Sequence, residues 1–295
     1  MNLKPECLSC LLNQSLRVTQ NLNLDELTAS RIMKMASASI ATYDNISPPV
    51  AASDLYPKVG VIVGEQDLYK ELKALSTREA MKLLPEVEKR LKNAPDSLKS
   101  AIKASVAGNV IDFATPTHFD LTLEFEKVFD TEFTIDDELH FLERLESAQS
   151  LMIVGDNVGE HLFDKLLLKS IKERYPSLQL YYAVRGEPII NDVTLKEAKE
   201  IGIDKVANLV DSGVDTPGLD YAHASEAFMK LYQRIDLIIA KGMGNYECLE
   251  GVKDERIFHL FKVKCEVVSQ EVGASLGSLV FMQNERGRLK GKSER

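Results

Sequence analysis

The sequence predicts an α/β protein with a Rossmann-like, three-layer α/β/α core that follows a helical N-terminal region. Beyond about residue 147, short apolar segments alternate with helix-compatible segments, a pattern typical of a largely parallel sheet covered by helices. Before that point the segments are longer, have helical spacing and are separated by Pro, Asn and Asp. We therefore expect a helical domain over residues 1–145 and an α/β core domain over residues 146–295.

The N-terminal region is expected to be helical. In residues 10–22, several apolar side chains lie roughly on one helical face. Further helices are expected over residues 65–75, 78–91, 97–113 and 136–145. Pro85 is expected to kink or divide the helix that contains it, because proline removes a backbone donor. No strand is expected before about Ser147.

The C-terminal region alternates between strands and helices. Strands are expected over residues 151–154, 179–184, 206–210, 235–240 and 257–263, and helices over residues 160–175 and 194–201. Because the strands are short and apolar, we expect helices to cover the sheet. The last residues, 284–295, are basic and are expected to fray.

The composition limits the classes of partner. The chain has 295 residues, a formal net charge of -9 and a pI near 5.2, which argues against a general nucleic-acid binder, because phosphate backbones favour clustered Lys and Arg. No apolar segment approaches the roughly 20 residues of a membrane-spanning helix. The N-terminus lacks the pattern of a secretory signal. We therefore expect a cytoplasmic protein without nucleic-acid or membrane partners.

Polar side chains gather directly after the expected strands. They are Asp156 and Asn157 after the first strand, Arg185 and Gly186 after the second, Asn191 and Asp192 in the loop beyond it, Asp211 after the third and Lys241 after the fourth. Ligands of open α/β sheets bind outside the carboxyl ends of the strands. The convergence of carboxylates, amides and cations at one edge therefore predicts a binding site.

Asp156 and Asn157 allow two interpretations. Either residue could simply cap the following helix. One residue is enough for a cap, however, and Gly159 permits close approach of the backbone. Oxygen ligands from a carboxylate and an amide suit a hard ion such as Mg2+ or Mn2+. We expect both residues to bind such an ion, with Glu160 beside them.

Asp192 is the stronger candidate for an ion ligand. Thr194 and Glu197 have the spacing of a capping box, so Thr194 can cap the next helix without help. Asp192 is then available to bind an ion. Arg185 could be an ordinary surface charge, but its place at the end of a strand favours a role in holding phosphate.

The segment from Lys241 to Asn245 has the ingredients of an anion site. A lysine followed by Gly242 and Gly244 offers a positive charge and exposed backbone N–H groups. An ordinary tight turn is the alternative. The segment is not a Walker loop, and the dinucleotide fingerprint GxGxxG is absent.

In the helical region, Gly108 is expected to interrupt a helix. Asn109 and Asp112 follow it, and they are either packing residues or residues that face the cleft. We include Asn109 among the candidates for substrate binding.

The cysteines leave three interpretations open. Cys7 and Cys10 form a Cys-x-x-Cys pair, and Cys248 and Cys265 are the remaining thiols. They are spectator thiols, part of a structural metal site, or a redox pair. A thioredoxin-like site is excluded, because that pair should follow a strand. The histidines show no ligand spacing.

Together, these motifs resemble those of a known family. Cys-x-x-Cys near the start, GNVIDF, GDNVGE, RGEPIINDVT, KGMGNYE and KVKC are similar to the archaeal and bacterial branch of the damage-control phosphatases, long catalogued as a domain of unknown function. The resemblance spans nearly the whole chain. It implies a helical region on an α/β/α core, and a metal-dependent phosphatase that acts on sugar phosphates or other phosphorylated metabolites.

The resemblance also implies roles for individual residues. Asp156, Asn157 and Asp192 match the metal ligands of the family, and Lys241, Gly242, Gly244 and Asn245 match its phosphate-binding segment. The position of the strand ends adds Arg185, Gly186, Asn191 and Glu160 as further candidates for substrate binding.

We therefore expect a metal-dependent phosphomonoester hydrolase with Asp156, Asn157, Asp192 and Lys241 as its catalytic residues. Its cofactor would be Mn2+, Mg2+, Ni2+ or Co2+, and its partner a small phosphorylated metabolite. The nucleophile is either water or the carboxylate of Asp156. The alternatives are a carboxyl methyltransferase that uses S-adenosylmethionine and a non-catalytic, zinc-stapled interaction protein. An oligomer is compatible with the sequence.

Overall fold

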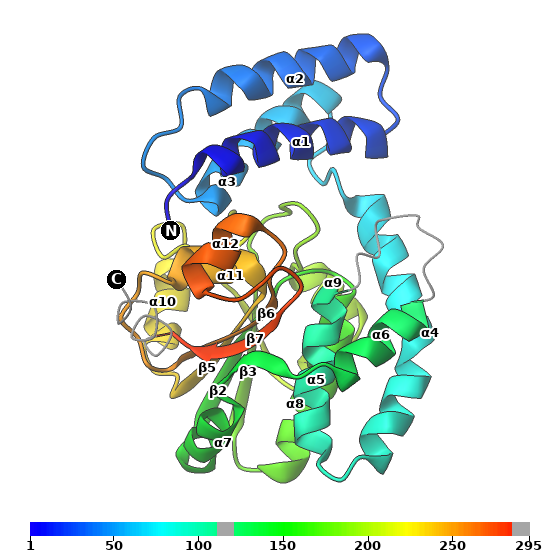
Figure 1. The fold of residues 1–295 in the computed structure, drawn as a ribbon, viewed down its shortest axis with the longest axis vertical. Coiled ribbons are helices and arrows are strands. Elements are labelled where there is room, and N and C mark those ends of the chain that lie inside the picture. The colour runs from blue at the N-terminus through cyan, green and yellow to red at the C-terminus, as the bar shows by residue number, and fades with distance from the viewer. Residues whose placement is uncertain (111–120, 285–295) are drawn as a thin grey trace.

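The computed structural model describes residues 1–110 and 121–284, and the side chains of residues 109, 110 and 121–125 lie outside this description. Its centre is a seven-stranded sheet in the order β1-β7-β6-β5-β2-β3-β4 (Figure 1). The strands are β1 (Phe133–Asp136), β2 (Ser150–Val154), β3 (Gln179–Val184), β4 (Asn208–Asp211), β5 (Leu237–Lys241), β6 (Ile257–Lys262) and β7 (Leu279–Gln283). Neighbouring strands are parallel except β6 and β7. The predicted α/β class is confirmed.

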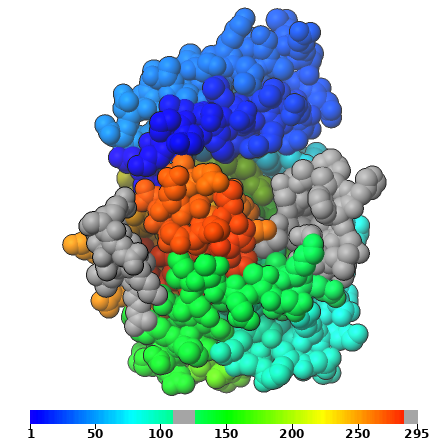
Figure 2. Space-filling view, viewed as in Figure 1, coloured from blue at the N-terminus to red at the C-terminus, as the bar shows by residue number. Residues whose placement is uncertain are grey.

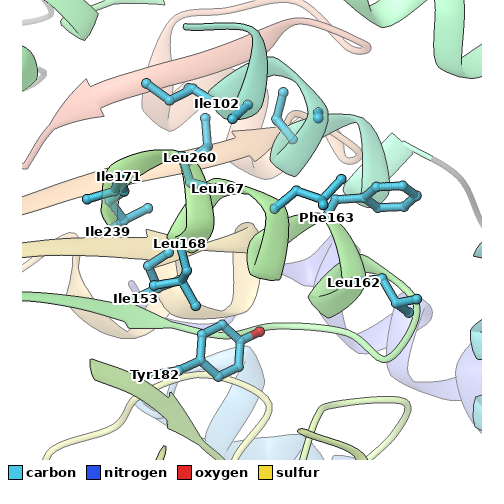
Figure 3. Close-up of a cluster of buried hydrophobic side chains, with 14 of the residues drawn as sticks. Ile102, Ile153, Leu162, Phe163, Leu167, Leu168, Ile171, Tyr182, Ile239 and Leu260 are labelled. Carbon is cyan, nitrogen blue, oxygen red and sulfur yellow. The ribbon is translucent and has the colours of Figure 1, made fainter. Parts of the chain in front are cut away.

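Helices cover both faces of the sheet, because side chains alternate along each strand. Ile153 and Ile239 lie in the core on one face, whereas their neighbours Met152 and Ile238 lie in the core on the other. The first face carries α4 (Lys70–Asn93), α5 (Ser97–Val110), α6 (Leu121–Asp130), α7 (Glu138–Ser147), α8 (Glu160–Arg174) and α9 (Leu195–Glu200). The second carries α10 (Glu226–Tyr232), α11 (Gly242–Leu249) and α12 (Glu266–Val272), and a short 3-10 helix, Ile203–Lys205, precedes β4. Figure 3 shows how side chains of α8 fill the space above the strands.

The first three helices form a separate layer above this core. They are α1 (Pro5–Asn21), α2 (Glu26–Ile40) and α3 (Pro48–Val63), and we call them the N-terminal three-helix unit (Figure 1). Their shared apolar core also receives Ile189 from the loop after β3. Figure 2 shows this unit, in blue, resting on the orange surface of the C-terminal helices. The domain boundary near residue 145 stays a prediction. Buried residues of α4 and α5, which precede that boundary, share the apolar core of the sheet.

The prediction that no strand precedes Ser147 was wrong. β1 is a short edge strand, Phe133–Asp136, of which only Phe133 is buried. It pairs with β7, whose residues lie almost 150 positions later in the chain; Phe133 aligns with Leu279. Because the partner is so distant in sequence, no local pattern marks this strand. β7, the antiparallel partner of β6, was also missed, since a short apolar segment does not distinguish strand from helix.

Three predicted interruptions of the helices are absent. Residues 78–91 and much of residues 65–75 belong to one helix, α4, and Pro85 does not divide it, so only the kink expected at Pro85 stays a prediction. Buried side chains on both sides of Pro85, Leu83 and Val87, pack into the main core and stabilise the helix across the proline. Gly108 does not interrupt α5. A Cβ atom there would lie 2.9 Å from the Cα atom of Glu160, so this glycine lets α5 and α8 approach closely.

The sheet has a topological switch point between β2 and β5. From β2 the chain proceeds outward to β3 and β4, whereas β5, β6 and β7 extend the sheet in the other direction. The chain therefore leaves β2 and β5 in opposite directions, and the carboxyl ends of these two strands are where open α/β sheets bind ligands. Within residues 1–110 and 121–284, no helix is long and apolar enough to cross a membrane.

Candidate functional site

The loop after β2 and the loop after β3 are joined by backbone hydrogen bonds. The N–H of Val193 donates to the carbonyl of Asp156 at 2.9 Å, and the N–H of Val158 donates to the carbonyl of Asn191 at 2.8 Å. Asn157 and Asp192 thus pair as an isolated antiparallel bridge. The structure therefore brings together Asp156, Asn157 and Asp192, which the strand ends predicted as neighbours.

These loops concentrate buried negative charge. Asp156, Asp192 and Glu160 are all buried. Burial, reinforced by the nearby charge of Asp192, raises the pKa of Asp156 to about 7. Burial and the charge of Asp156 raise the pKa of Glu160 to about 7 in the same way. Carboxylates that resist ionisation when close together are stabilised in their ionised form by a cation between them.

Arg185 partly compensates the negative charge of these carboxylates. Its Nε donates to Oδ2 of Asp192 at 2.7 Å, and both side chains are buried. Burial raises the pKa of Asp192 even though Arg185 opposes the rise. Among the described residues, Nη1 and Nη2 of Arg185 have no hydrogen-bond partner. Arg185 therefore holds the carboxylate of Asp192 through Nε, and its two terminal nitrogens are available for further hydrogen bonds.

The amide of Asn157 is oriented by two carboxylates. Its Nδ2 donates to Oδ2 of Asp156 and to Oε1 of Glu160, each at 2.8 Å. With the nitrogen occupied in this way, the amide oxygen is the atom that can bind an ion. Two carboxylates and one amide oxygen form the donor set that hard divalent ions prefer, so the residues fit Mg2+ or Mn2+.

Gly242 directly follows β5 and lies against Asp156. Its φ is +75°, and a Cβ atom at this position would lie 1.9 Å from Oδ2 of Asp156. α11 begins at this glycine, so the positive end of the helix dipole lies beside the carboxylate. Gly244 is equally restricted, since a Cβ atom there would lie 1.8 Å from the carbonyl oxygen of Pro217. Both glycines are needed for close approach of backbone to the site.

Lys241 and Asn245 lie behind these loops. Nζ of Lys241 donates to Oδ1 of Asp164 at 2.5 Å and lies 3.8 Å from Oε2 of Glu160. Burial alone would lower the pKa of Lys241, but the charges of Asp164 and Glu160 raise it above its ordinary value. The amide of Asn245 bonds backbone groups of Gly155, Leu219 and Lys241 itself. Direct contact of either side chain with phosphate stays a prediction.

A cavity of about 290 Å³ lies between the N-terminal three-helix unit and these loops. Asp156, Asn157, Asn191 and Asp192 line one side, and Leu11, Pro48 and Pro49 from α1 and α3 line another. Lys264, after β6, also lines it. The charge of Lys264 lowers the pKa values of Asp156 and Glu160, in opposition to their burial. Lys264 was not predicted as a site residue, although it lies just beyond the end of a strand, as Lys241 lies at one.

The remaining candidates for substrate binding lie in three different settings. Gly186 packs against Gly213, and a Cβ atom there would lie 2.8 Å from the Gly213 backbone, which indicates a packing role. Asn191 lines the cavity. Asn109 and Asp112 lie outside the described residues, the former by its side chain and the latter entirely.

Three of the cysteines line the same cavity. Cys7 and Cys10 face it from α1 and Cys265 from the start of α12, whereas Cys248 lies apart, near Gly218. Burial raises the pKa of Cys7 and of Cys265, so both favour the neutral thiol. In the part of the chain that the structure describes, no three His, Cys, Asp or Glu side chains are placed to hold an ion by themselves. A thiolate metal site at Cys7 and Cys10 stays a prediction.

Known proteins share this architecture over nearly the full length. A family model described as the damage-control phosphatase ARMT1-like domain matches residues 3–280. A damage-control phosphatase of Pyrococcus horikoshii is 33% identical over 97% of this chain and 99% of its own. One of Archaeoglobus fulgidus is 32% identical over 95% of this chain and 98% of its own. The crystal structure of a DUF89 family protein from P. horikoshii superposes with a TM-score of 0.90, at 33% identity, over 97% of this chain and 100% of that chain.

Proposed function

Because the chain belongs to the ARMT1-like damage-control phosphatase family, we propose that it is a metal-dependent phosphatase that hydrolyses small phosphomonoesters such as sugar phosphates. In the cell this reaction would remove damaged or unwanted phosphorylated metabolites. The observation that carries the proposal is the meeting of Asp156, Asn157 and Asp192 on one side of a cavity that Lys264 also lines. Oxygen donors for an ion and a cation for phosphate face the same space.

The roles of the residues follow from their positions. Asp156, Asn157 and Asp192 would hold the ion, and Arg185 keeps Asp192 in place. A bound divalent ion polarises a phosphoryl oxygen and offsets negative charge that develops in the reaction. Lys264 is placed to bind phosphate oxygens, as are the backbone N–H groups at the start of α11. The nucleophile is either water or the Asp156 carboxylate.

The cavity also supports a small substrate. At about 290 Å³, with α1 and α3 on one side, it suits a metabolite rather than a macromolecular chain. Its apolar wall, which includes Leu11, Pro48 and Pro49, would contact the part of the substrate that does not react. Lys264 would contact the phosphoryl group on the polar side, where the carboxylates would hold the ion.

The proposed function is tested by phosphate release from a panel of sugar phosphates and from p-nitrophenyl phosphate. Protein stripped with a chelator should be inactive, and Mn2+, Ni2+, Co2+ or Mg2+ should each be tried for restoration of turnover. We expect at least one ion to restore release of inorganic phosphate, because the ligands alone leave a cluster of negative charge that repels the substrate. Full activity in the chelated protein would contradict metal dependence. A thermal shift with S-adenosylmethionine and no phosphate release would favour a methyltransferase instead.

Lys264→Ala should weaken the use of every phosphorylated substrate. Loss of one charge-assisted contact to phosphate is expected to lower kcat/KM about 10-fold, mainly through a higher KM. The matched control is Lys253→Ala, an exposed lysine in the turn before β6, at the opposite end of that strand. Steady-state kinetics on both variants measure the effect. An equal effect of the two substitutions would assign the loss to overall charge rather than to a phosphate contact.

A further inference from the structure

A buried carboxylate, Asp164 on α8, lies among donors from three other elements. Ser105 on α5 donates its hydroxyl to Oδ1 at 2.6 Å, and Tyr182 on β3 donates its hydroxyl to Oδ2 at 2.8 Å. Lys241, at the end of β5, donates to Oδ1 at 2.5 Å. Figure 3 shows the ring of Tyr182 within the apolar cluster, with its hydroxyl at the edge. An ionised carboxylate deep in a core is kept by this kind of complete set of partners.

These contacts give Lys241 a fixed orientation. Nζ also donates to the carbonyl oxygen of Ser105 at 3.1 Å, and the side chain is fully buried. From this position Nζ lies 3.8 Å from Oε2 of Glu160. Asp164 and the carbonyl of Ser105 accept from the ammonium group and fix its place. Glu160 is then the further carboxylate that the positive charge of Lys241 attracts.

Glu160 in turn reaches the candidate ion ligands. Its Oε1 accepts from Nδ2 of Asn157 at 2.8 Å, and the same Nδ2 donates to Oδ2 of Asp156 at 2.8 Å. A continuous series of polar contacts thus runs from Asp164 through Lys241 and Glu160 to Asn157. Residues that support metal ligands in this way set the orientation of the ligand atoms.

We propose that Asp164 is a positioning residue of the phosphatase site: it fixes Lys241 beside Glu160, and Glu160 then holds Asn157 and Asp156 in the arrangement that the reaction needs. This inference rests on the proposed function. It separates Asp164 from an ordinary packing role, because a buried ion pair contributes little net stability that a well-packed apolar pair would not. The buried pair of Asp164 and Lys241 is therefore better explained by the fixed position that it gives to Glu160 and, through Glu160, to the ion ligands.

A double-mutant cycle tests the proposal through kcat. The variants are Asp164→Asn, Lys241→Met and the two combined. If Asp164 acts through Lys241, each single variant should lower kcat about 10²-fold with KM changed by less than about 3-fold. The combined variant should then be no slower than Lys241→Met. Independent roles would multiply to a loss of about 10⁴-fold, and that result would overturn the proposal, as would wild-type kcat in Asp164→Asn.

The combined variant also keeps the test decisive if a single variant does not fold. Asp164→Asn leaves the charge of Lys241 buried without its partner and is expected to lower the unfolding temperature, whereas the combined variant removes both charges. Should the single variant not fold, the comparison of the combined variant with Lys241→Met still decides. Tyr182→Phe removes one donor but keeps the ion pair, and it should lose less activity than Asp164→Asn. Absence of turnover in the wild-type protein contradicts the proposed function itself, whereas wild-type turnover with multiplied losses contradicts only the role of Asp164.

Discussion

Asp192→Asn should abolish metal-dependent phosphate release while the protein stays folded. The amide cannot supply the negative charge that binds the ion, and loss of several kcal/mol of transition-state stabilisation corresponds to a fall of about 10³-fold or more in kcat. Asn keeps the volume of Asp192 and an oxygen that can accept from Nε of Arg185. Phosphate release with saturating Mn2+ measures the loss, and circular dichroism confirms the fold.

The position of Arg185 makes Asp192→Ala a different experiment. Removal of the carboxylate would leave the guanidinium buried without its charge partner, and breaking a buried pair in this way costs about 3–5 kcal/mol. The expectation is therefore inactivity together with a marked fall in the free energy of unfolding. Denaturant titration of the Ala and Asn variants should separate the two effects.

Asp211→Asn is the matched control. Asp211 also ends a parallel strand, the edge strand β4, but it is exposed, and its carboxylate accepts from the backbone N–H of Gly213 at 2.8 Å. Its replacement should leave kcat and KM unchanged. Full activity in Asp192→Asn, or an equal loss in Asp211→Asn, would remove Asp192 from the site.

Much of the candidate site could be predicted because its residues follow strand ends. Parallel strands bring their carboxyl ends to one edge, so Asp156 and Asp192 had to lie near each other once β2 and β3 were recognised. The capping-box argument was also confirmed, since Glu197 accepts from the backbone N–H of Thr194 at 3.1 Å. Because Thr194 and Glu197 cap α9, Asp192 is not needed as a cap.

The direction of the side chains could not be predicted. Lys241 was expected to bind phosphate, which stays a prediction; in the structure its ammonium donates to Asp164 and lies 3.8 Å from Glu160. That orientation depends on α5 and α8, whose packing brings together residues 136 and 77 positions away from Lys241. Sequence spacing fixes where a residue emerges from a strand, whereas tertiary packing decides where its charged end lies.

The cover over the site was also beyond prediction. Helices in the N-terminal region follow from apolar periodicity, but nothing local shows that α1 and α3 close the cavity above Asp156. Ile189 and its neighbour Ile190, from the loop that leads to Asp192, pack against the core of the N-terminal three-helix unit. Two apolar residues in an otherwise polar loop carry no recognisable pattern.

Gly242→Ala should inactivate the protein through Asp156 rather than through the backbone alone. At φ +75°, any residue with a Cβ atom pays a conformational cost of about 1–2 kcal/mol. At Gly242 the Cβ atom would also lie 1.9 Å from Oδ2 of Asp156, a distance that no packing tolerates. Either the start of α11 or the carboxylate must move. We expect kcat to fall about 10²-fold or more, because a small displacement of a ligand has that effect.

Gly273→Ala provides a control with the same backbone. Gly273 ends α12, also with φ +75°, but a Cβ atom there would meet nothing within 4 Å. Both variants should lose a similar amount of stability from the left-handed conformation, about 1–2 kcal/mol, and only Gly242→Ala should lose ion-dependent activity in addition. Unfolding curves and phosphate release on the pair thus separate strain from displacement. Equal activity in the two variants would mean that the start of α11 does not position Asp156, and Gly242 would be removed from the site.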